Sequence, residues 1–303
     1  MTSSSNPMLK LILDSKALSI WNHKTGPVFW YAAGVPGPFY LNTELMIGRE
    51  LADRLLEAIT TIVAKEPEPK TRAEALRSVI MAAYEQHADF RAVIRALVEQ
   101  AKKDFPAGTY TAVSGGERRD WLFSIPLAEE MGIKHIYFFK NQSVFCAEPL
   151  TGGEKTLHVS DLINNAASYF DMWLPMMQKA SLSCVGTLTV NTRGTAGVKR
   201  MEEAGYKVVA LNRIELPFFQ ELAASGLIDR ATLDEVALYL TSAKDWAARY
   251  VMQDAALFDI AHLDKKSLER MTSFFAKDPW GLEPQHQAFF ATMRTAIAAR
   301  QAA

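Results

Sequence analysis

The stretch TLHVSDLINNAAS, Thr156 to Ser168, decides our prediction of the fold. Thr156–Val159 predicts a short buried strand, and a polar loop that begins at Ser160 follows it. Ser168 with Asp171 resembles a capping box at the start of a helix. A strand that runs through a loop into a helix N-terminus directs free backbone N–H groups into one small volume, where the helix dipole adds partial positive charge. The stretch therefore predicts an anion-binding loop at the ligand-binding end of a strand.

Strands and helices alternate on both sides of this stretch. Further strands are expected at Thr109–Val113, Ile133–Phe139, Leu182–Val190 and Tyr206–Leu211, and helices at Trp121–Met131, 166–180 and 195–204. This alternation is typical of parallel strands joined by crossover helices. We expect an α/β fold whose central sheet is parallel, with residues 108–213 as its contiguous core. The segment Lys140–Lys155 is expected to be a loop.

The flanking regions follow different patterns. Val28–Asn42 is aromatic and is interrupted by glycine and proline, which predicts two short strands joined by a turn. A helical insertion is expected at about 70–103, and only helices are expected from Glu215 onward. We therefore expect an α/β domain over residues 1–214 and a helical extension over residues 215–303 that packs on it.

Composition excludes several classes of function. The chain has 303 residues, of which 49% are hydrophobic, and this is enough for a substantial core. The net charge of -1 gives no electrostatic footprint for nucleic acid or for an anionic membrane. No apolar run approaches the roughly twenty residues of a membrane span. Cys146 and Cys184 lack metal-ligand spacing and are expected to be buried thiols rather than a disulfide, which fits a cytoplasmic protein.

The loop SGGERRDW, residues 114–121, is the first of three candidate ligand-binding loops. Its two glycines permit a tight or positive-φ backbone. Arg118 and Arg119 offer planar sets of donors that suit phosphate or carboxylate. Alternatively, the loop is a surface turn in which these arginines pair with Glu117 and Asp120.

The second candidate loop is Ser160–Ser168. Its carboxylate, Asp161, could accept hydrogen bonds from ribose hydroxyl groups, and its amides, Asn164 and Asn165, could donate to phosphate oxygens, as could Ser168. Alternatively, these side chains satisfy only the turn and the helix cap.

The third candidate loop is NTRGTAG, Asn191–Gly197. Arg193 could contact a ligand across the site, and Gly194 and Gly197 allow a close approach of the backbone. An exposed arginine in a glycine turn is an equally good interpretation.

Taken in this order, the loops resemble those of the type I phosphoribosyltransferases, and most closely those of orotate phosphoribosyltransferase, over about residues 9–215. The family signature is a buried strand, two acids, two further residues and a Thr-Thr-Gly-Gly-Thr/Ser phosphate loop, and here the same register reads SDLINNAAS. The family's pyrophosphate loop, its Ile-Pro-Leu-Ala helix and the next strand resemble SGGERRDWLFSIPLAEEMGIKHIYFFK. The N-terminal hairpin of the orotate enzymes resembles VFWYAAGVPGPFYLNT, and their late strand and arginine–glycine turn resemble LTVNTRGTAGVKRMEEAGYKVVAL.

The sequence departs from the family pattern in several places. Ser160 stands where the first of the two acids is expected, and Ala166 and Ala167 replace both glycines of the phosphate loop. A lysine expected in the hairpin falls on Ala32 or Ala33. The family's mobile catalytic loop is rich in Lys and His, whereas here it reads NQSVFCAEPLTGGE and contains neither. The resemblance therefore implies the fold but identifies no catalytic residues.

The resemblance also implies three groups of ligand-binding residues. The phosphate and ribose group comprises Ser160, Asp161, Asn164, Asn165, Ala166, Ala167 and Ser168; the pyrophosphate-loop group comprises Ser114, Gly115, Gly116, Arg118, Arg119 and Lys140; and the base-side group comprises Phe39, Tyr40 and Arg193. No metal ligand is assigned, and magnesium would be the cofactor of an active form. The expected partners are a small phosphorylated ligand, such as phosphoribosyl pyrophosphate or a nucleotide, and a second copy of the chain in a homodimer.

Three functions are consistent with this pattern. Each preorganised electrostatic group in an active site is typically worth roughly a hundred- to a thousand-fold in rate, so the departures would remove most catalysis, although such losses do not add simply. The first interpretation is a diverged protein that binds a phosphorylated ribose or nucleotide with little or no transferase activity. The second is an active phosphoribosyltransferase that transfers ribose 5-phosphate to a pyrimidine-like base such as orotate. The third is a structural or interaction protein that uses the helical extension.

Overall fold

The computed structural model describes residues 7–24 and 26–302. These residues form two compact units. One unit contains Leu18–Leu41 and residues 216–302, and the other contains residues 7–17 and Asn42–Glu215. The aromatic hairpin segment therefore groups with the C-terminal helices, whereas the sequence grouped it with the α/β domain.

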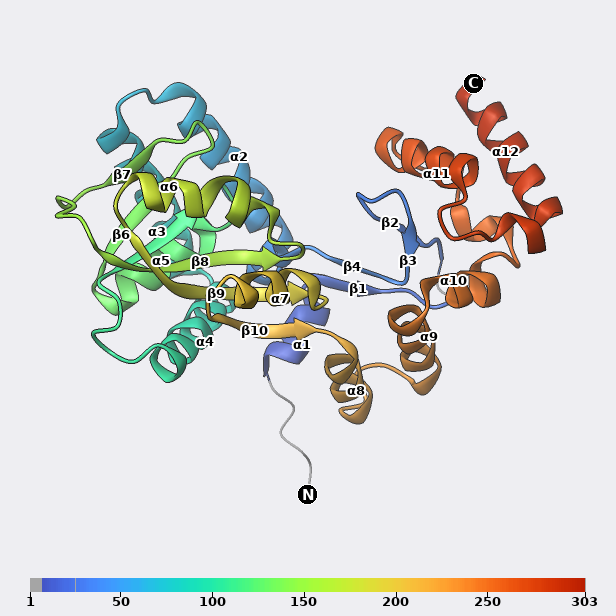
Figure 1. Cartoon of the computed structure of the whole chain (residues 1–303), viewed down its shortest axis with the longest axis horizontal. Helices are drawn as coiled ribbons and strands as arrows, with labels where there is room; N and C mark the ends of the chain where they lie inside the picture. Colours follow the sequence, from blue (N-terminus) through green and yellow to red (C-terminus); the bar gives the residue numbers. More distant parts are fainter. Residues whose placement is uncertain (1–6, 25, 303) are drawn as a thin grey trace. The chain divides into compact units, whose positions relative to one another are not determined.

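The α/β unit is built on a six-stranded sheet in the order β10-β9-β8-β5-β6-β7 (Figure 1). The strands are β5 Ala112–Gly116, β6 Lys134–Phe138, β7 Val144–Cys146, β8 Lys155–Ile163, β9 Ser183–Arg193 and β10 Val208–Ile214. All neighbouring pairs are parallel except β6 with β7. The predicted α/β fold with a parallel centre is confirmed, and Thr156–Val159 lies inside the sheet, in β8.

Strand β7 corrects one prediction, because it lies within the segment Lys140–Lys155 that was expected to be a loop. Its residues Val144, Phe145 and Cys146 pair antiparallel with β6 at the edge of the sheet. Pairing satisfies backbone groups that an irregular segment would leave to solvent.

Helices connect and cover these strands. They are α1 Pro7–Asp14, α2 Arg49–Lys65, α3 Pro69–Gln86, α4 Ala88–Asp104, α5 Trp121–Met131, α6 Leu174–Lys179 and α7 Ala196–Glu203, and a 3-10 turn covers Thr43–Ile47. The chain enters α6 through a π-helical turn, Tyr169–Trp173. Leu157 and Val159 of β8 are fully buried, as expected for the centre of a parallel sheet.

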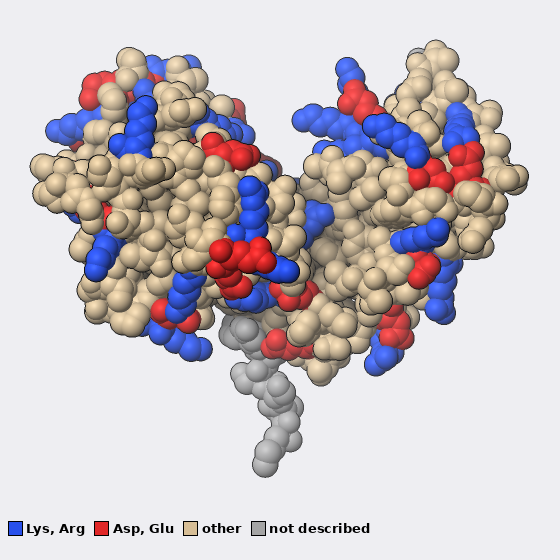
Figure 2. Space-filling view, viewed as in Figure 1, with Lys and Arg blue, Asp and Glu red and all other residues tan. Residues whose placement is uncertain are grey.

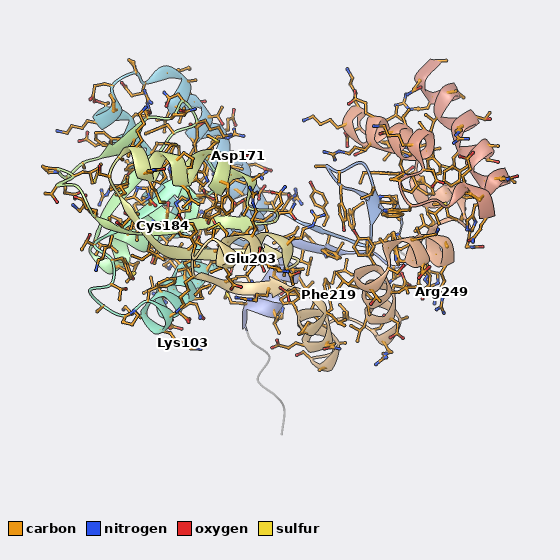
Figure 3. All side chains as sticks on the ribbon, viewed as in Figure 1. Lys103, Asp171, Cys184, Glu203, Phe219 and Arg249 are labelled. Atoms are coloured by element: carbon orange, nitrogen blue, oxygen red, sulfur yellow. The ribbon has the colours of Figure 1, made fainter. Side chains whose placement is uncertain are left out.

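The second unit contains two short antiparallel strand pairs and helices. Strand β1 Leu18–Ile20 pairs with β4 Phe39–Leu41, and β2 Phe29–Trp30 pairs with β3 Pro36–Gly37. The helices are α8 Leu216–Ala224, α9 Arg230–Thr241, α10 Ala243–Trp246, α11 Lys265–Lys277 and α12 Gln287–Ala302. Figure 3 marks Phe219 in α8 and Arg249 in the π-helical turn Ala247–Val251 that follows α10. The buried core of this unit includes Trp21, Val28, Trp30, Trp246, Phe258, Phe274, Phe275 and Phe290.

The surface charge, the helices and the two cysteines bear on the predictions made from composition. On the face shown in Figure 2, basic and acidic side chains are interspersed. None of the described helices combines the length and the apolar character that a membrane crossing requires. Cys146 and Cys184 are free and only partly buried, and desolvation raises the pKa of each thiol to about 11.

Candidate functional site

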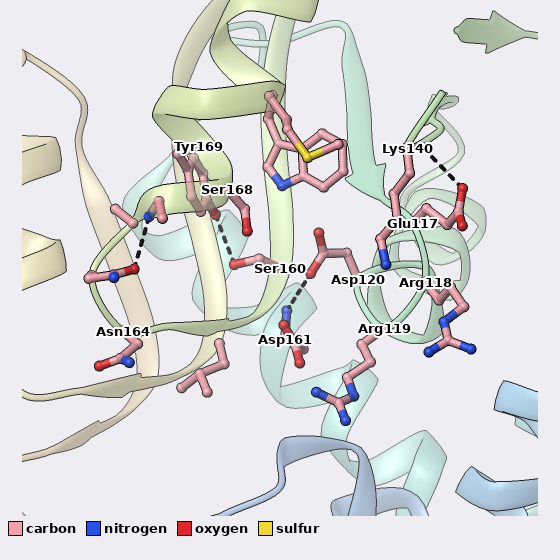
Figure 4. A pocket seen from close by; sticks show the side chains of 16 residues that line it. Glu117, Arg118, Arg119, Asp120, Lys140, Ser160, Asp161, Asn164, Ser168 and Tyr169 are labelled. Atoms are coloured by element: carbon pink, nitrogen blue, oxygen red, sulfur yellow. Dashed lines mark hydrogen bonds between the residues drawn. The ribbon is translucent and has the colours of Figure 1, made fainter. Parts of the chain in front are cut away.

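A pocket of about 380 Å³ opens at the carboxyl ends of the sheet strands (Figure 4). It is lined by Glu117, Arg118, Arg119, Asp120, Lys140, Ser160, Asp161, Leu162, Asn164, Asn165, Ala166, Ala167, Ser168, Tyr169, Met172 and Trp173. The loop after β5 and the loop after β8 therefore meet, because parallel strands end at the same edge of a sheet.

The turn after β8 differs in detail from the prediction. Strand β8 continues to Ile163, so Ser160 and Asp161 are strand residues rather than loop residues. Ala166 has φ 58°, a left-handed conformation that favours glycine. The predicted capping box is wrong, because Ser168 has helical dihedral angles and makes no side-chain cap hydrogen bond. Instead, Asn165 Oδ1 accepts a hydrogen bond of 3.1 Å from the Ala167 amide.

Ser160, which stands where the resemblance places the first acid, is 2% exposed. The Tyr169 hydroxyl donates a hydrogen bond of 2.8 Å to Ser160 Oγ and shares a second hydrogen bond with Thr187 Oγ1. Burial raises the pKa of Tyr169 far above its usual range, so this hydroxyl stays neutral. The Ser160 hydroxyl is therefore part of a buried hydrogen-bond network.

Asp120 contributes a second carboxyl group to the pocket. Its Oδ1 accepts a hydrogen bond of 3.0 Å from the Asp161 amide, and its Oδ2 accepts one of 3.1 Å from the Gly116 amide. The His158 ring is fully buried, with Nε2 3.7 Å from Asp120 Oδ2. The sequence indicated Asp120 only as a possible partner of Arg118 or Arg119, because its contacts with Gly116 and Asp161 exist only in the folded chain.

Asp161 lies in a strongly perturbed environment. Burial, the neighbouring Asp120 carboxylate, a hydrogen bond between the two carboxyl groups and Glu44 raise the pKa of Asp161 well above its usual range, while Arg119 opposes the shift. Asp161 can therefore hold its proton more tightly than a solvated aspartate. A protonated carboxyl group can both donate and accept hydrogen bonds, which suits it to a hydroxyl-bearing ligand.

The basic side chains that line the pocket come from two loops. Arg119 pairs with the buried Glu44 at 3.0 Å, and Arg118 donates to Thr60 Oγ1. The alternative pairing of these arginines with Glu117 and Asp120 is not seen among the described contacts. Glu117 instead accepts a hydrogen bond of 3.0 Å from the Lys140 amide, so the loops after β5 and β6 are joined.

The glycines of the first loop are required by packing and not by backbone conformation. Neither Gly115 nor Gly116 has a positive φ, so the positive-φ backbone that glycine permits is not used at these two positions. A Cβ at Gly115 would lie 2.1 Å from Ser124 Oγ, and one at Gly116 would lie 2.3 Å from the Trp173 ring. Close packing therefore excludes a side chain at both positions.

The third loop joins the second through its backbone. The Gly197 amide donates a hydrogen bond of 3.0 Å to the Asn164 carbonyl, and a Cβ at Gly197 would lie 2.3 Å from that oxygen. Gly194 has φ 69° and has no such close neighbour. Of the two glycines expected to allow a close approach, only Gly197 does so.

Several residues of the implied site do not line the pocket. Ser114 is fully buried with Oγ 2.9 Å from His158 Nδ1, and Arg193 ends β9 without lining the pocket. Phe39 and Tyr40 belong to the other unit, where Phe39 is buried against Phe219 and Tyr40 is 37% exposed. Within residues 7–24 and 26–302, no three His, Cys, Asp or Glu side chains are grouped as a metal site.

No protein-family model and no curated protein matches the sequence. Solved structures do match: UMP synthase from Leishmania donovani has 13% sequence identity and a TM-score of 0.55, over 79% of this chain and 43% of that chain. Orotate phosphoribosyltransferase from Francisella tularensis has 10% identity and a TM-score of 0.54, over 77% of this chain and 97% of that chain. This chain therefore spans less than half of the Leishmania protein and nearly all of the Francisella enzyme. The chain has the α/β fold of the type I phosphoribosyltransferases, in the form found in orotate phosphoribosyltransferase.

Proposed function

We propose that this protein is a diverged relative of orotate phosphoribosyltransferase that binds a phosphorylated ribose or nucleotide and has little or no transferase activity. One observation carries the proposal: the pocket retains a polar loop at a helix start, whereas the Ser160 hydroxyl is bonded to Tyr169 within the core. The binding surface is thus kept, and one of the two sugar-binding acids is lost.

Phosphate binding is supported by what surrounds the loop Asn164–Ser168. Backbone N–H groups at a helix N-terminus attract anions whatever the side chains are, so the replacement of the family threonines and glycines does not remove this property. Arg118, Arg119 and Lys140 line the same pocket and supply positive charge for a second anionic group.

Low turnover is supported by the segment 141–154, which stands in the place of the family's catalytic loop. It contains neither lysine nor histidine. Part of it, Val144–Cys146, is held as strand β7 against the edge of the sheet. A segment fixed in this way and lacking cationic groups supplies no charge to stabilise a departing pyrophosphate.

A second candidate function, an active transferase, is favoured by one specific observation. Asp120 and Asp161 are adjacent in the pocket, so two carboxyl groups are present although Ser160 is not an acid. If these two groups bind the ribose hydroxyls, phosphoribosyl transfer to a base such as orotate remains chemically feasible.

The proposal includes three further features of the protein. Ligand binding needs no magnesium, because Asp161 is the remaining member of the signature acid pair and both oxygens of the neighbouring Asp120 already accept backbone N–H groups. The protein works in the cytoplasm, where reducing conditions suit the free thiols of Cys146 and Cys184. Two copies form a homodimer, which light scattering at micromolar concentration tests directly.

The deciding experiment is a thermal-shift and calorimetry panel on the full chain. Its ligands are phosphoribosyl pyrophosphate, ribose 5-phosphate, nucleoside monophosphates and orotate, each with and without magnesium. We expect phosphorylated sugars to raise Tm without magnesium, and we expect no pyrophosphate release when a base is added. Pyrophosphate release would establish the active transferase. No stabilisation by any phosphorylated ligand at millimolar concentration would favour the interaction protein.

A matched variant separates sugar binding from phosphate binding. Asp161→Ala should weaken ribose 5-phosphate more than inorganic phosphate, because only the contact to the sugar is lost. Asp89→Asn, which removes a charge from an exposed position of α4 outside the pocket lining, is the control. Equal weakening of both ligands by Asp161→Ala would contradict the assignment of the sugar to this residue.

A further inference from the structure

Strands β5 and β8 stop pairing before they reach the pocket. Their last paired residues are Ser114 and His158. Beyond this point Gly116 pairs with β6, and Asp161 lies on the stretch of β8 that continues beside β9. The Asp120 carboxylate bridges the two strand ends, because its two oxygens accept the backbone N–H groups of Gly116 and Asp161 at 3.1 and 3.0 Å (Figure 4).

The two strand ends lead to different parts of the pocket. Strand β5 runs into the loop with Arg118 and Arg119, and β8 runs through Asp161 into the loop Asn164–Ser168. We propose that Asp120 is a positioning residue that fixes the spacing between these two anion subsites. The pocket then selects a ligand with two separate phosphate-type groups, such as phosphoribosyl pyrophosphate, over a sugar monophosphate. This inference rests on the proposed function and adds ligand selectivity to it.

The surroundings of Asp120 suit a fixed bridge. The residue is 7% exposed, and both of its hydrogen bonds join a carboxylate to a backbone amide, which is a strong and directional pairing. His158 Nε2 lies 3.7 Å from Oδ2, is buried and has no hydrogen-bond partner among the described residues. The ring therefore faces the carboxylate without replacing either of its hydrogen bonds to the backbone. The other charged or titratable groups that act on this carboxyl pair are Arg119, Glu44 and Tyr169.

The substitution Asp120→Asn separates geometry from charge. The amide oxygen can accept one of the two N–H groups, whereas the amide NH2 faces the other N–H group and cannot accept it. Removal of a negative charge would by itself strengthen the binding of an anion. Loss of the bridge should instead weaken a ligand that must reach both loops. The sign of the change therefore distinguishes a positioning role from a merely electrostatic one.

The experiment is calorimetry on the full chain with phosphoribosyl pyrophosphate and ribose 5-phosphate. Asp120→Asn should weaken phosphoribosyl pyrophosphate by about tenfold or more and ribose 5-phosphate by less than about threefold, because only the first ligand spans both subsites. Asp89→Asn, which removes the same charge at an exposed position of α4 outside the pocket lining, should leave both affinities unchanged.

Amide NMR supplies a readout that does not depend on a ligand. In the wild type, the amide protons of Gly116 and Asp161 should exchange slowly with solvent, and in Asp120→Asn at least one of them should exchange faster. Rapid exchange of either amide in the folded wild type would overturn the bridge even if the variant fails to fold.

The outcomes separate this inference from the proposed function. Two results would overturn the positioning role alone, provided that the wild type binds tightly. One is an equal change in affinity for both ligands in Asp120→Asn. The other is stronger binding of phosphoribosyl pyrophosphate by Asp120→Asn than by the wild type. A wild type that binds neither ligand would overturn the proposed function and this inference with it.

Discussion

The Tyr169 hydroxyl donates a 2.8 Å hydrogen bond to the Ser160 hydroxyl oxygen, and both residues are almost completely buried. The tyrosine comes from the π-helical turn that follows the loop Asn164–Ser168, and the serine comes from β8. A wide turn of this kind is frequent at functional sites. Here it brings a phenol next to Ser160, so the residue at the position where the resemblance places the first acid takes part in a neutral hydrogen bond.

The first prediction concerns restoration of that acid. Ser160→Asp should lower stability by about 3 kcal/mol or more, because a new carboxylate would be buried beside Asp120 and Asp161. It should produce no magnesium-dependent gain in affinity for phosphoribosyl pyrophosphate. Thermal unfolding and calorimetry check the two parts. Ser78→Asp, at an exposed position of α3, is the control for introducing the same side chain. A stable Ser160→Asp variant with magnesium-dependent binding would mean that the acid pair of the family is only one substitution away.

The second prediction concerns Arg118, whose guanidinium donates to Thr60 and whose side chain is exposed at the pocket. Arg118→Ala should weaken the binding of phosphoribosyl pyrophosphate by about tenfold to a hundredfold, through loss of a charge-assisted hydrogen bond worth roughly 1.5–3 kcal/mol. It should change Tm little, because an exposed arginine contributes little to stability. Titration calorimetry measures the affinity, and Arg95→Ala on the exposed face of α4 is the control. Equal affinities in the variant and the wild type would remove Arg118 from the site.

The third prediction is that Arg119 has mainly a structural effect. Arg119→Ala should reduce the free energy of unfolding by about 1–3 kcal/mol, since it leaves the buried Glu44 carboxylate without its ionic partner. Glu44 Oε2 already lacks a hydrogen-bond partner among the described residues, so little else can compensate. Urea denaturation measures the loss. Adding Glu44→Gln to Arg119→Ala should recover part of it, and failure of that double variant to recover any stability would show that the pair is not the cause.

The fold could be predicted largely because its signals are local. The central strands contain short apolar segments, such as Leu157 to Val159 apart from His158, and helix ends carry their own signals, such as Gly132 in the left-handed conformation after α5. Strand β7 was missed because it is short and lies at the sheet edge. The hairpin segment 18–41 could not be assigned to its unit, because its apolar partners lie about two hundred residues further along the chain.

The candidate pocket was predicted in part for the same reason. The loops after β5 and β8 could be located because each follows a strand directly. The contacts of Asp120 and Arg119 could not be predicted, since their partners Asp161 and Glu44 lie far away in sequence and no periodic pattern connects them. Ser160 was identified as a departure from the family, but its bond to Tyr169 depends on the π-helical turn, which has no clear sequence signal.

The fourth prediction follows from the raised pKa of Asp161. The unfolded chain releases this proton near pH 3.8, whereas burial and the Asp120 carboxylate hold it in the folded state to higher pH. Between these two pKa values the folded state binds more protons than the unfolded state, so this residue makes stability fall as pH rises. Asp161→Asn should therefore be more stable than the wild type at neutral pH, with a difference that shrinks as pH falls toward 4. Urea denaturation from pH 4 to pH 8 measures the difference, and a constant difference across this range would contradict the shift.

The last prediction concerns the unit that joins the hairpin segment to the C-terminal helices. Trp21 packs edge-on against Trp246 with ring centroids 5.5 Å apart, and Trp30 packs on Phe258 and Phe274, each with centroids 5.9 Å apart. The Arg270 guanidinium also donates a 3.0 Å hydrogen bond to the Trp30 carbonyl. These contacts bury large apolar side chains that are each worth roughly 1.5–3 kcal/mol.

A fragment ending at residue 214 keeps Trp21 and Trp30 but loses all of these partners. It should therefore unfold at a lower temperature than the full chain, and its tryptophan emission should shift to longer wavelength as the indoles become exposed to water. A chain that ends at Ile297, and so lacks the exposed residues 298–302 at the end of α12, is the control and should leave both measurements unchanged. If the 1–214 fragment keeps the Tm and the emission of the full chain, the hairpin segment does not depend on the C-terminal helices, and the boundary at residue 214 predicted from the sequence would describe an independent domain.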